Sequence, residues 1–231
     1  IIDKEWPASE VLPAVLTAEE VADMDKAVSE AQSADVIIAV MGEDEYRVGE
    51  SRSRTSLELP GRQRELLQAL HATGKPVVLV LINGQPLTIN WEDQNLPAIL
   101  EAWFPSFQGG KIIAETLFGD YNPGGRLPLT YYNSLDELPA FDDYSVKNRT
   151  YQYFEGKPLY EFGYGLSYTN FKYKKKSIMQ SNDTVDITFN LSNVGKYDGD
   201  EVAQVYVRYP ETGTYMPLKQ LKGFSRVHLK K

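Results

Sequence analysis

Short apolar runs alternate with amphipathic segments along the first half of the chain. The apolar runs are rich in Val, Ile and Leu, a pattern typical of strands that are buried on both faces. These runs are residues 35–40, 76–82 and 97–103. The amphipathic segments carry apolar residues three or four positions apart, as helices with one packed face do. These segments are residues 17–33, 62–73 and 108–119. The alternation predicts an α/β fold, a parallel sheet with helices on both faces.

Local signals mark where these elements begin and end. Thr17 and Glu20 have the spacing of a capping box, which predicts a helix that starts directly after Thr17. Gly74 and Gly119 follow the later helical segments and are expected to end them. A further short strand is predicted over residues 126–130.

The pattern changes after about residue 131. The next residues are aromatic and rich in turn formers without a helical period, which indicates an ordered, extended connection. From about Thr169 onward, polar and apolar residues alternate in four segments that are separated by turns. Four such strands predict a β-sandwich, and because a sandwich of this type has about seven strands, we expect an incomplete one.

Composition narrows the classes of function. The net charge of −8 argues against nucleic acid as a partner, because nucleic acid selects basic surfaces. No run of eighteen apolar residues occurs, so no membrane partner is expected. The chain has no cysteine and two histidines, His71 and His228, which disfavours disulfides, metal sites and a Ser-His-Asp triad. We therefore expect neither a metal nor a cofactor.

An acidic and basic loop follows the first apolar run. It contains Glu43, Glu50 and Arg54, and it leaves the end of a predicted strand, where α/β folds commonly place their chemistry. The same residues would also suit a solvated surface loop with scattered, weak ion pairs. A nucleotide-binding, flavodoxin-like domain is a third hypothesis. It is disfavoured because an acidic loop repels phosphate and no glycine-rich phosphate motif occurs.

Four long motifs connect the chain to a known family. In chain order they read MGEDEYRVGESRSRTSLELPGRQ, GKPVVLVLINGQPL, EAWFPSFQGGKIIAETLFGDYNPGGRLPLT and PLYEFGYGLSYTNFKY. Together they resemble the C-terminal region of glycoside hydrolase family 3, the β-glucosidase and β-xylosidase family. The resemblance covers nearly the whole chain.

The resemblance implies a domain organisation. Residues 1–133 would form the family's α/β sandwich domain with its acid/base loop, and residues 134–165 an aromatic-rich connector. Residues 166–231 would form an incomplete fibronectin type III-like β-sandwich. Members of the family generally carry, ahead of this region, a barrel-like domain that supplies an Asp nucleophile, and this sequence lacks it. The chain opens IIDKEWPASE, without the features of a signal peptide, and this start looks internal.

The resemblance also implies an activity. The chain would be the C-terminal portion of a retaining, exo-acting β-glucosidase or β-xylosidase that hydrolyses terminal β-linked sugars. Its expected partners are a β-linked oligosaccharide or glycoside and the barrel domain of the same enzyme. Without the barrel, we expect this chain alone to be inactive. The family suggests a bacterial protein that is periplasmic or secreted, although a cytoplasmic location stays open.

Retaining enzymes need two carboxylates about 5–5.5 Å apart, a nucleophile and a general acid/base. Glu50 is our preferred acid/base, because it precedes Arg54 by four residues, as in short-loop members of the family. Glu43, in a Gly-Glu pair directly after the strand, is the alternative; otherwise it would bind sugar hydroxyls or hold an Arg. Arg54 is expected to anchor the loop at the substrate site, and Tyr46 to line a sugar subsite.

A second hypothesis places the chain outside catalysis. The aromatic residues 144–173 could bind carbohydrate or a partner domain, which would make the chain a non-catalytic binding module. Binding of a disaccharide by the chain alone would favour this alternative.

Overall fold

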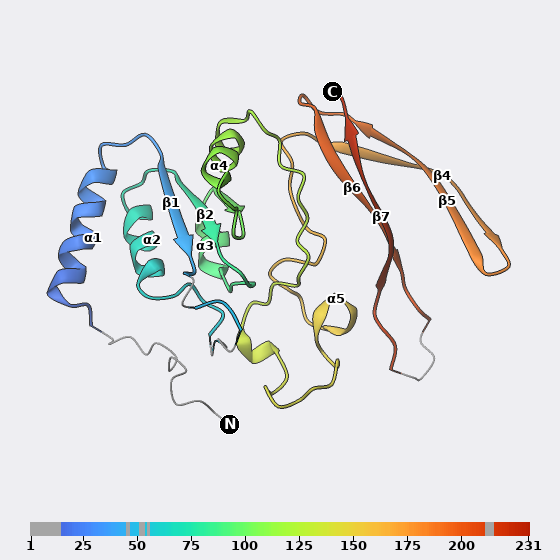
Figure 1. Cartoon of the computed structure of the whole chain (residues 1–231), viewed down its shortest axis with the longest axis horizontal. Coiled ribbons are helices and arrows are strands. Elements are labelled where there is room, and N and C mark those ends of the chain that lie inside the picture. The colour runs from blue at the N-terminus through green and yellow to red at the C-terminus, as the bar shows by residue number, and fades with distance from the viewer. Residues whose placement is uncertain (1–14, 45–46, 51–53, 55, 211–214) are drawn as a thin grey trace. The chain divides into compact units, whose positions relative to one another are not determined.

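The structure of the protein is a computed structural model that describes residues 15–44, 47–50, 54, 56–210 and 215–231 (Figure 1). The chain divides into two compact units. The first unit comprises Ile1–Gly110, Tyr131–Asp142 and Gly156–Leu159, and the second comprises Lys111–Thr130, Asp143–Glu155 and Tyr160–Lys231.

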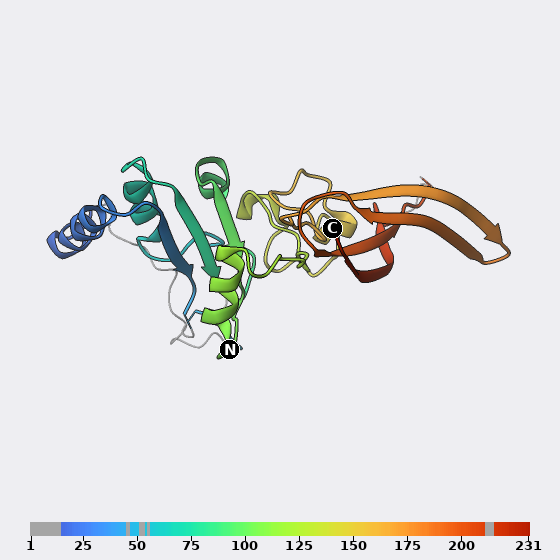
Figure 2. The same ribbon diagram turned by 90° about the horizontal axis from the view of Figure 1, so that it is seen from above.

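The first unit contains a parallel three-stranded sheet in the order β1-β2-β3. The strands are β1 (Ile37–Gly42), β2 (Val77–Ile82) and β3 (Ala98–Glu101). Ile37 pairs with Val77, and Val78 pairs with Ala98, so the carboxyl ends of all three strands meet at one edge of the sheet. Figure 2 shows the arrowheads of β1 (blue) and β2 (teal) pointing the same way.

One helix precedes the first strand and two connect the strands, as the alternating pattern predicts. They are α1 (Ala18–Ala31), α2 (Gln63–His71) and the short α3 (Asn90–Asn95). Helix α1 packs beside α2, and α2 packs against β1 (Figure 1). Leu67 and Leu70 of α2 are buried, together with Val77, Leu79 and Val80 of the central strand. The predicted α/β fold with a parallel sheet is therefore confirmed.

Helix boundaries follow the local signals in the sequence. The capping box is present in both directions: the Glu20 amide donates to Thr17 Oγ1 at 3.2 Å, and the Thr17 amide donates to Glu20 Oε2 at 2.7 Å. Gly74 follows α2 with φ +76°, and Gly119 follows α4 (Gly109–Phe118) with φ +83°. Glycine adopts this left-handed backbone without a side-chain clash, which ends each helix cleanly.

The prediction that the first strand is buried on both faces is wrong. Ala39 is buried, but its neighbours Ile38 and Val40 are 48% and 57% exposed. Strand β1 lies at the edge of the sheet, and successive side chains of a strand point to opposite faces. Within the described part of the first unit, one face of β1 is packed and the other is open.

The second unit contains the four predicted β-strands as two antiparallel pairs. One pair is a long hairpin of β4 (Phe171–Ser181) and β5 (Thr184–Asn193), and the other pairs β6 (Gly199–Val207) with β7 (Gln220–Leu229) (Figure 1). The pairs are consistent with a fibronectin type III-like sandwich. Two short helices lie in the connection before them: η1 (Leu135–Glu137), in the first unit, and α5 (Thr150–Tyr153), in the second.

The predicted strand over residues 126–130 is wrong. Leu127 makes two backbone hydrogen bonds to the turn around Tyr164: its amide donates to the Tyr164 carbonyl at 2.8 Å, and its carbonyl accepts from the Gly163 amide at 2.7 Å. These bonds satisfy Leu127 alone and do not extend into a ladder of paired residues. The segment therefore stays irregular although its composition suits a strand.

An ion pair fixes this segment to the β-strands of the second unit. The guanidinium of Arg126 pairs with Glu201 of β6, and their side chains are only 12% and 13% exposed. Tyr173 of β4 donates its hydroxyl to the other oxygen of Glu201 at 2.7 Å. Burial and the neighbouring Glu201 carboxylate both raise the pKa of Tyr173, so the hydroxyl keeps its proton and remains a donor.

We expect Arg126→Met to lower the free energy of unfolding by about 2–3 kcal/mol, because it leaves the half-buried Glu201 carboxylate without a cation. Urea denaturation followed by circular dichroism measures the change. Lys111→Met is the control: its pair with Glu115 is exposed, at 72% and 40%, and its removal should change the stability by less than about 0.5 kcal/mol. Equal effects of the two substitutions would contradict the assigned role of Arg126.

Candidate active site

The loop that carries the candidate residues starts from a constrained glycine at the end of β1. Gly42 has φ +136°, and a Cβ atom at this position would lie 2.0 Å from the carbonyl oxygen of Ile82. Only glycine fits so close to the neighbouring strand. The next residue, Glu43, donates its amide to the same Ile82 carbonyl at 2.8 Å. The chain therefore leaves the sheet in a defined direction.

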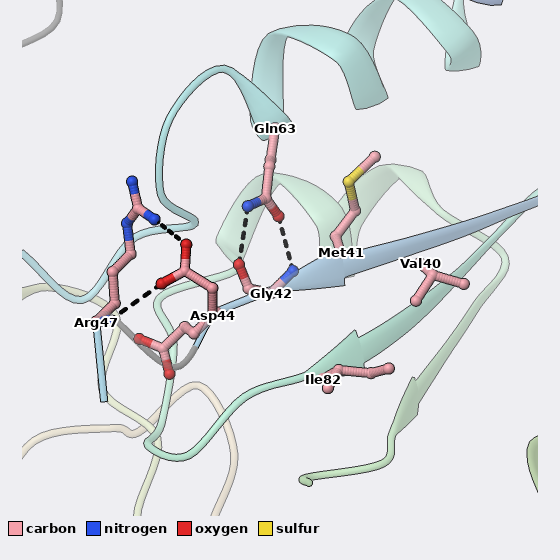
Figure 3. Close-up of a pocket in the computed structure, with 8 residues that line it drawn as sticks. Val40, Met41, Gly42, Asp44, Arg47, Gln63 and Ile82 are labelled. Atoms are coloured by element: carbon pink, nitrogen blue, oxygen red, sulfur yellow. Dashed lines mark hydrogen bonds and ion pairs between the residues drawn. The ribbon is translucent and has the colours of Figure 1, made fainter. Parts of the chain in front are cut away.

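A side-chain amide binds both backbone polar groups of the same glycine. Gln63, the first residue of α2, donates to the Gly42 carbonyl at 2.8 Å and accepts from the Gly42 amide at 2.7 Å (Figure 3). These two bonds imitate the pairing that a neighbouring strand would offer to the edge strand β1. They fix the start of the loop to the helix that follows it.

Glu43 is buried at the root of the loop, with a side chain that is 0% exposed. Its Oε1 atom accepts from Gln85 Nε2 at 2.8 Å, and its Oε2 atom accepts from the Gly84 amide at 3.1 Å. The Arg54 guanidinium forms an ion pair with Oε1. Both carboxylate oxygens are thus occupied by donors from the loop itself and from the turn after β2.

Arg54 also closes the loop on itself. Its second terminal nitrogen, Nη2, donates to the carbonyl of Glu58, while Nη1 binds Glu43. The structure therefore brings Glu43 and Arg54 together, eleven residues apart in the chain.

Of the other two candidates, the structure describes only Glu50. Glu50 lies in a turn between these anchored ends and is exposed. Tyr46 falls outside the described residues. The catalytic and substrate-binding roles of all four residues stay predictions.

An open pocket of about 290 Å³ adjoins the start of the loop. Val40, Met41 and Ile82 line it with apolar surface, and Asp44 and Arg47 are among its polar residues (Figure 3). Asp44 and Arg47, which form the polar rim of this pocket, are bonded to each other. The Oδ1 atom of Asp44 accepts from the Arg47 amide at 3.1 Å, and its Oδ2 atom pairs with the Arg47 guanidinium. The rim thus combines hydrogen-bonding groups with an apolar wall, as small-molecule sites commonly do.

A second carboxylate, which the sequence reasoning missed, lies at the end of β3. Glu101 accepts from the Tyr131 hydroxyl at 2.8 Å, from the Trp103 amide at 3.1 Å and from Asn83 Nδ2 at 3.4 Å. Burial raises the pKa of Glu101, the three hydrogen bonds counteract part of the rise, and the nearby Glu43 adds to it. The signal was available: Asn83 and Glu101 end parallel strands in the same way as Glu43.

Metal sites and membrane-spanning helices are absent from the described part of the chain. No group of three or more His, Asp or Glu side chains there is placed to hold a metal ion. No helix in the same residues is long and apolar enough to cross a membrane.

The raised pKa of Glu101 predicts a pH-dependent stability. The folded chain holds this proton to a higher pH than the unfolded chain, whose group titrates near the ordinary value of 4.5. The stabilising contribution is therefore complete below that pH and is lost as the pH rises through the folded-state pKa. Glu101→Gln cannot titrate, so the difference in unfolding free energy between variant and wild type should move in favour of the variant as the pH rises above the ordinary value of 4.5. Urea titrations at several pH values measure it, and a difference that does not change with pH would contradict it.

Comparison with known proteins connects this site to relatives. The chain is 42% identical over 223 residues to a periplasmic beta-glucosidase of Salmonella typhimurium, an alignment that covers 90% of the chain and 29% of the relative. It is 40% identical over 216 residues to a beta-xylosidase of Formosa agariphila, covering 89% and 30%. The chain thus spans about a third of the length of these curated relatives.

Solved structures share the fold over nearly the whole chain. A beta-glucosidase from Kluyveromyces marxianus in complex with glucose superposes with a TM-score of 0.85 at 29% identity, covering 94% of this chain and 28% of that one. A beta-glucosidase from Listeria innocua in complex with glucose gives a TM-score of 0.80 at 29% identity, covering 94% and 32%.

Family profiles match most of the sequence. The glycosyl hydrolase family 3 C-terminal domain matches residues 7–168, and a fibronectin type III-like domain matches residues 201–231. The first match contains the loop with Glu43, Glu50 and Arg54 together with the three strand ends that surround it. The chain belongs to glycoside hydrolase family 3, and it corresponds to the family's C-terminal domain followed by fibronectin type III-like sequence.

Proposed function

We propose that this chain is the acid/base-bearing part of a retaining, exo-acting β-glucosidase or β-xylosidase. Its relatives bear these two names, and a solved relative was crystallised with glucose. The observation that carries the proposal is the contrast within one loop. Glu43 is buried and ion-paired at the root, and Glu50 is exposed between the anchored ends.

This contrast favours Glu50 over Glu43 as the proton donor. A general acid must come within hydrogen-bond reach of the glycosidic oxygen, about 2.6–3.2 Å. The two oxygens of Glu43 already accept from Arg54, Gln85 and Gly84, and no part of its side chain is exposed. We assign Glu43 and Arg54 to anchoring the loop, and Tyr46 to a sugar subsite.

The proposed reaction has two steps. In the first step, the Glu50 carboxyl donates its proton to the glycosidic oxygen while an Asp nucleophile attacks the anomeric carbon, and the alcohol leaves. In the second step, the Glu50 carboxylate takes a proton from a water molecule that attacks the same carbon and releases the Asp, so the configuration is retained. We assign the Asp to a barrel domain ahead of this chain in the whole enzyme.

Anchoring matters because both steps depend on where Glu50 lies. The loop is held at its start by Gln63 and Glu43 and at its end by Arg54. Preorganised catalytic groups gain much of their effect from such positioning, and a displacement of about 1 Å can cost about a hundredfold in rate.

The expected location follows the relatives as well. One relative is named periplasmic, and we propose that the enzyme is bacterial and acts in the periplasm or outside the cell on β-linked glycosides. A cytoplasmic location is the alternative, and fractionation of cells that produce the whole enzyme separates the two.

The role of Glu50 predicts a dependence on the leaving group. In the enzyme that contains this chain, Glu50→Gln should lower kcat/KM for alkyl or unactivated aryl β-glycosides by at least about a hundredfold, and far less for 2,4-dinitrophenyl glycosides. Poor leaving groups need the proton, whereas dinitrophenolate does not. Azide, which attacks without a general base, should restore turnover of the activated substrate in Glu50→Ala and yield the β-glycosyl azide.

Glu43→Gln is the matched control. It leaves Arg54 without its buried anion and loosens the loop, so we expect lower stability. Because Glu50 is displaced but still present, we expect a leaving-group dependence of kcat/KM well below that of Glu50→Gln, and no azide rescue. If Glu43→Gln shows the leaving-group dependence and the azide rescue instead, the assignment of the two glutamates is reversed.

The chain alone should have no measurable turnover on aryl β-glycosides, because the nucleophile would lie outside it. The purified 231-residue chain and the whole enzyme are compared on the same substrate, over several hours and at high protein concentration. Robust hydrolysis by the chain alone would contradict the proposal.

The alternative that the chain is a non-catalytic binding module is tested with the same purified chain. Tyr144, Tyr164, Tyr168 and Tyr173 are exposed along the aromatic stretch. Calorimetric titration with cellobiose or xylobiose would show micromolar binding if the chain is a binding module. Several other rings of this stretch stack inside the second unit, such as Tyr151 on Phe162 at 4.2 Å, which favours packing over ligand binding.

A further inference from the structure

The turn after β2 lies between two carboxylates. On one side, the Gly84 amide and the Gln85 side chain donate to Glu43. On the other side, Asn83 Nδ2 donates to Glu101 at 3.4 Å and also to the Gln85 carbonyl at 2.8 Å. The three residues of this turn, which we call the Asn83–Gln85 turn, thus join the ends of β1 and β3 through hydrogen bonds.

The same turn packs directly against the loop that carries Glu50. A Cβ atom at Gly84 would lie 2.6 Å from Val48 Cγ1 and 2.8 Å from Phe104 Cε2. Gly84 therefore lies in close contact with Val48, two residues before Glu50, on one side and with Phe104, in the segment after β3, on the other. A shift of the turn would displace Val48 as well as the two donors that hold Glu43.

Glu101 holds this turn at a cost in stability. Asn83 and Tyr131 are 0% and 1% exposed, so their polar groups meet Glu101 away from water. The Glu101 carboxylate accepts three hydrogen bonds, but among the described residues no cation forms an ion pair with it. A buried carboxylate without a cation is costly, and such groups are found preferentially at functional sites.

We propose that Glu101 is a positioning residue for the reaction proposed above: with Tyr131, it holds the Asn83–Gln85 turn against the segment that carries Glu50. The connection runs from Tyr131 through Glu101 and Asn83 to the turn, and from there to Glu43 and Val48. Glu101 does not touch the substrate. It acts by fixing the distance between Glu50 and the glycosidic oxygen, and this inference rests on the proposed function of Glu50.

Two substitutions in the enzyme that contains this chain test the inference. Glu101→Gln keeps the shape but turns an acceptor oxygen into an amide donor facing the donors of Tyr131, Asn83 or Trp103. Tyr131→Phe removes only the hydroxyl. A displaced proton donor should lower kcat/KM for an unactivated aryl β-glycoside by about tenfold or more, and change that for a 2,4-dinitrophenyl glycoside by less than about threefold.

The control is Glu137→Gln. Glu137 is another partly buried carboxylate of the first unit that accepts a backbone amide, from Asn133 at 2.8 Å, and among the described residues no hydrogen bond joins it to the Asn83–Gln85 turn. We expect Glu137→Gln to leave kcat/KM for both substrates unchanged within about twofold. Thermal unfolding of every variant is measured alongside, so that loss of folded enzyme is separated from loss of alignment.

The outcomes separate this inference from the proposed function. If Glu50→Gln shows the leaving-group dependence and neither Glu101→Gln nor Tyr131→Phe does, only the positioning role is overturned. If Glu101→Gln and Tyr131→Phe lower kcat/KM equally for both substrates and also lower the unfolding temperature, Glu101 has a structural role. That outcome would also overturn the positioning role. If Glu50→Gln lacks the dependence, the proposed function fails and this inference fails with it.

Discussion

The buried pair of Glu43 and Arg54 is the interaction on which the candidate site depends. Taking both charges out of water is costly, and the pair is tolerated because Gln85, Gly84 and the Glu58 carbonyl complete the hydrogen bonding of its members. Removing one partner would leave the other as a buried, uncompensated charge. The pair therefore joins residues 43 and 54, the two ends of the loop, while Glu50 between them is exposed.

The parallel sheet explains why so many polar groups meet around this pair. All three strands end at one edge, and each end carries a residue with a polar side chain: Glu43 directly after β1, Asn83 directly after β2, and Glu101 as the last residue of β3. In α/β folds this edge is the ordinary place for a site, because the strand order fixes the spacing and the loops are free to vary. Here the edge contributes rigidity, and the loop contributes the exposed carboxylate.

The second unit is organised by a different set of contacts. Arg126 and Glu201 tie the segment after α4 to β6, and stacked rings such as Tyr153 on Tyr215, 5.2 Å apart, fill the stretch before β4. Many of the aromatic residues there are thus internal packing of this unit. The predicted domain boundaries at residues 133 and 165 remain predictions.

The sequence alone determined those elements that depend on residues close to one another in the chain. The capping box of Thr17 and Glu20, the stop at Gly74 and the apolar runs of β2 and β3 depend on neighbours a few residues away, and the family motifs were legible in the same way. Only the tertiary structure decided that β1 has an open face, that residues 126–130 form no strand, and that Glu43 is buried whereas Glu50 is exposed. The network of Glu101 with Tyr131 and Asn83 likewise joins residues 18 and 30 positions apart. Burial and long-range hydrogen bonds depend on which segments meet in space, and no periodicity in the sequence records that.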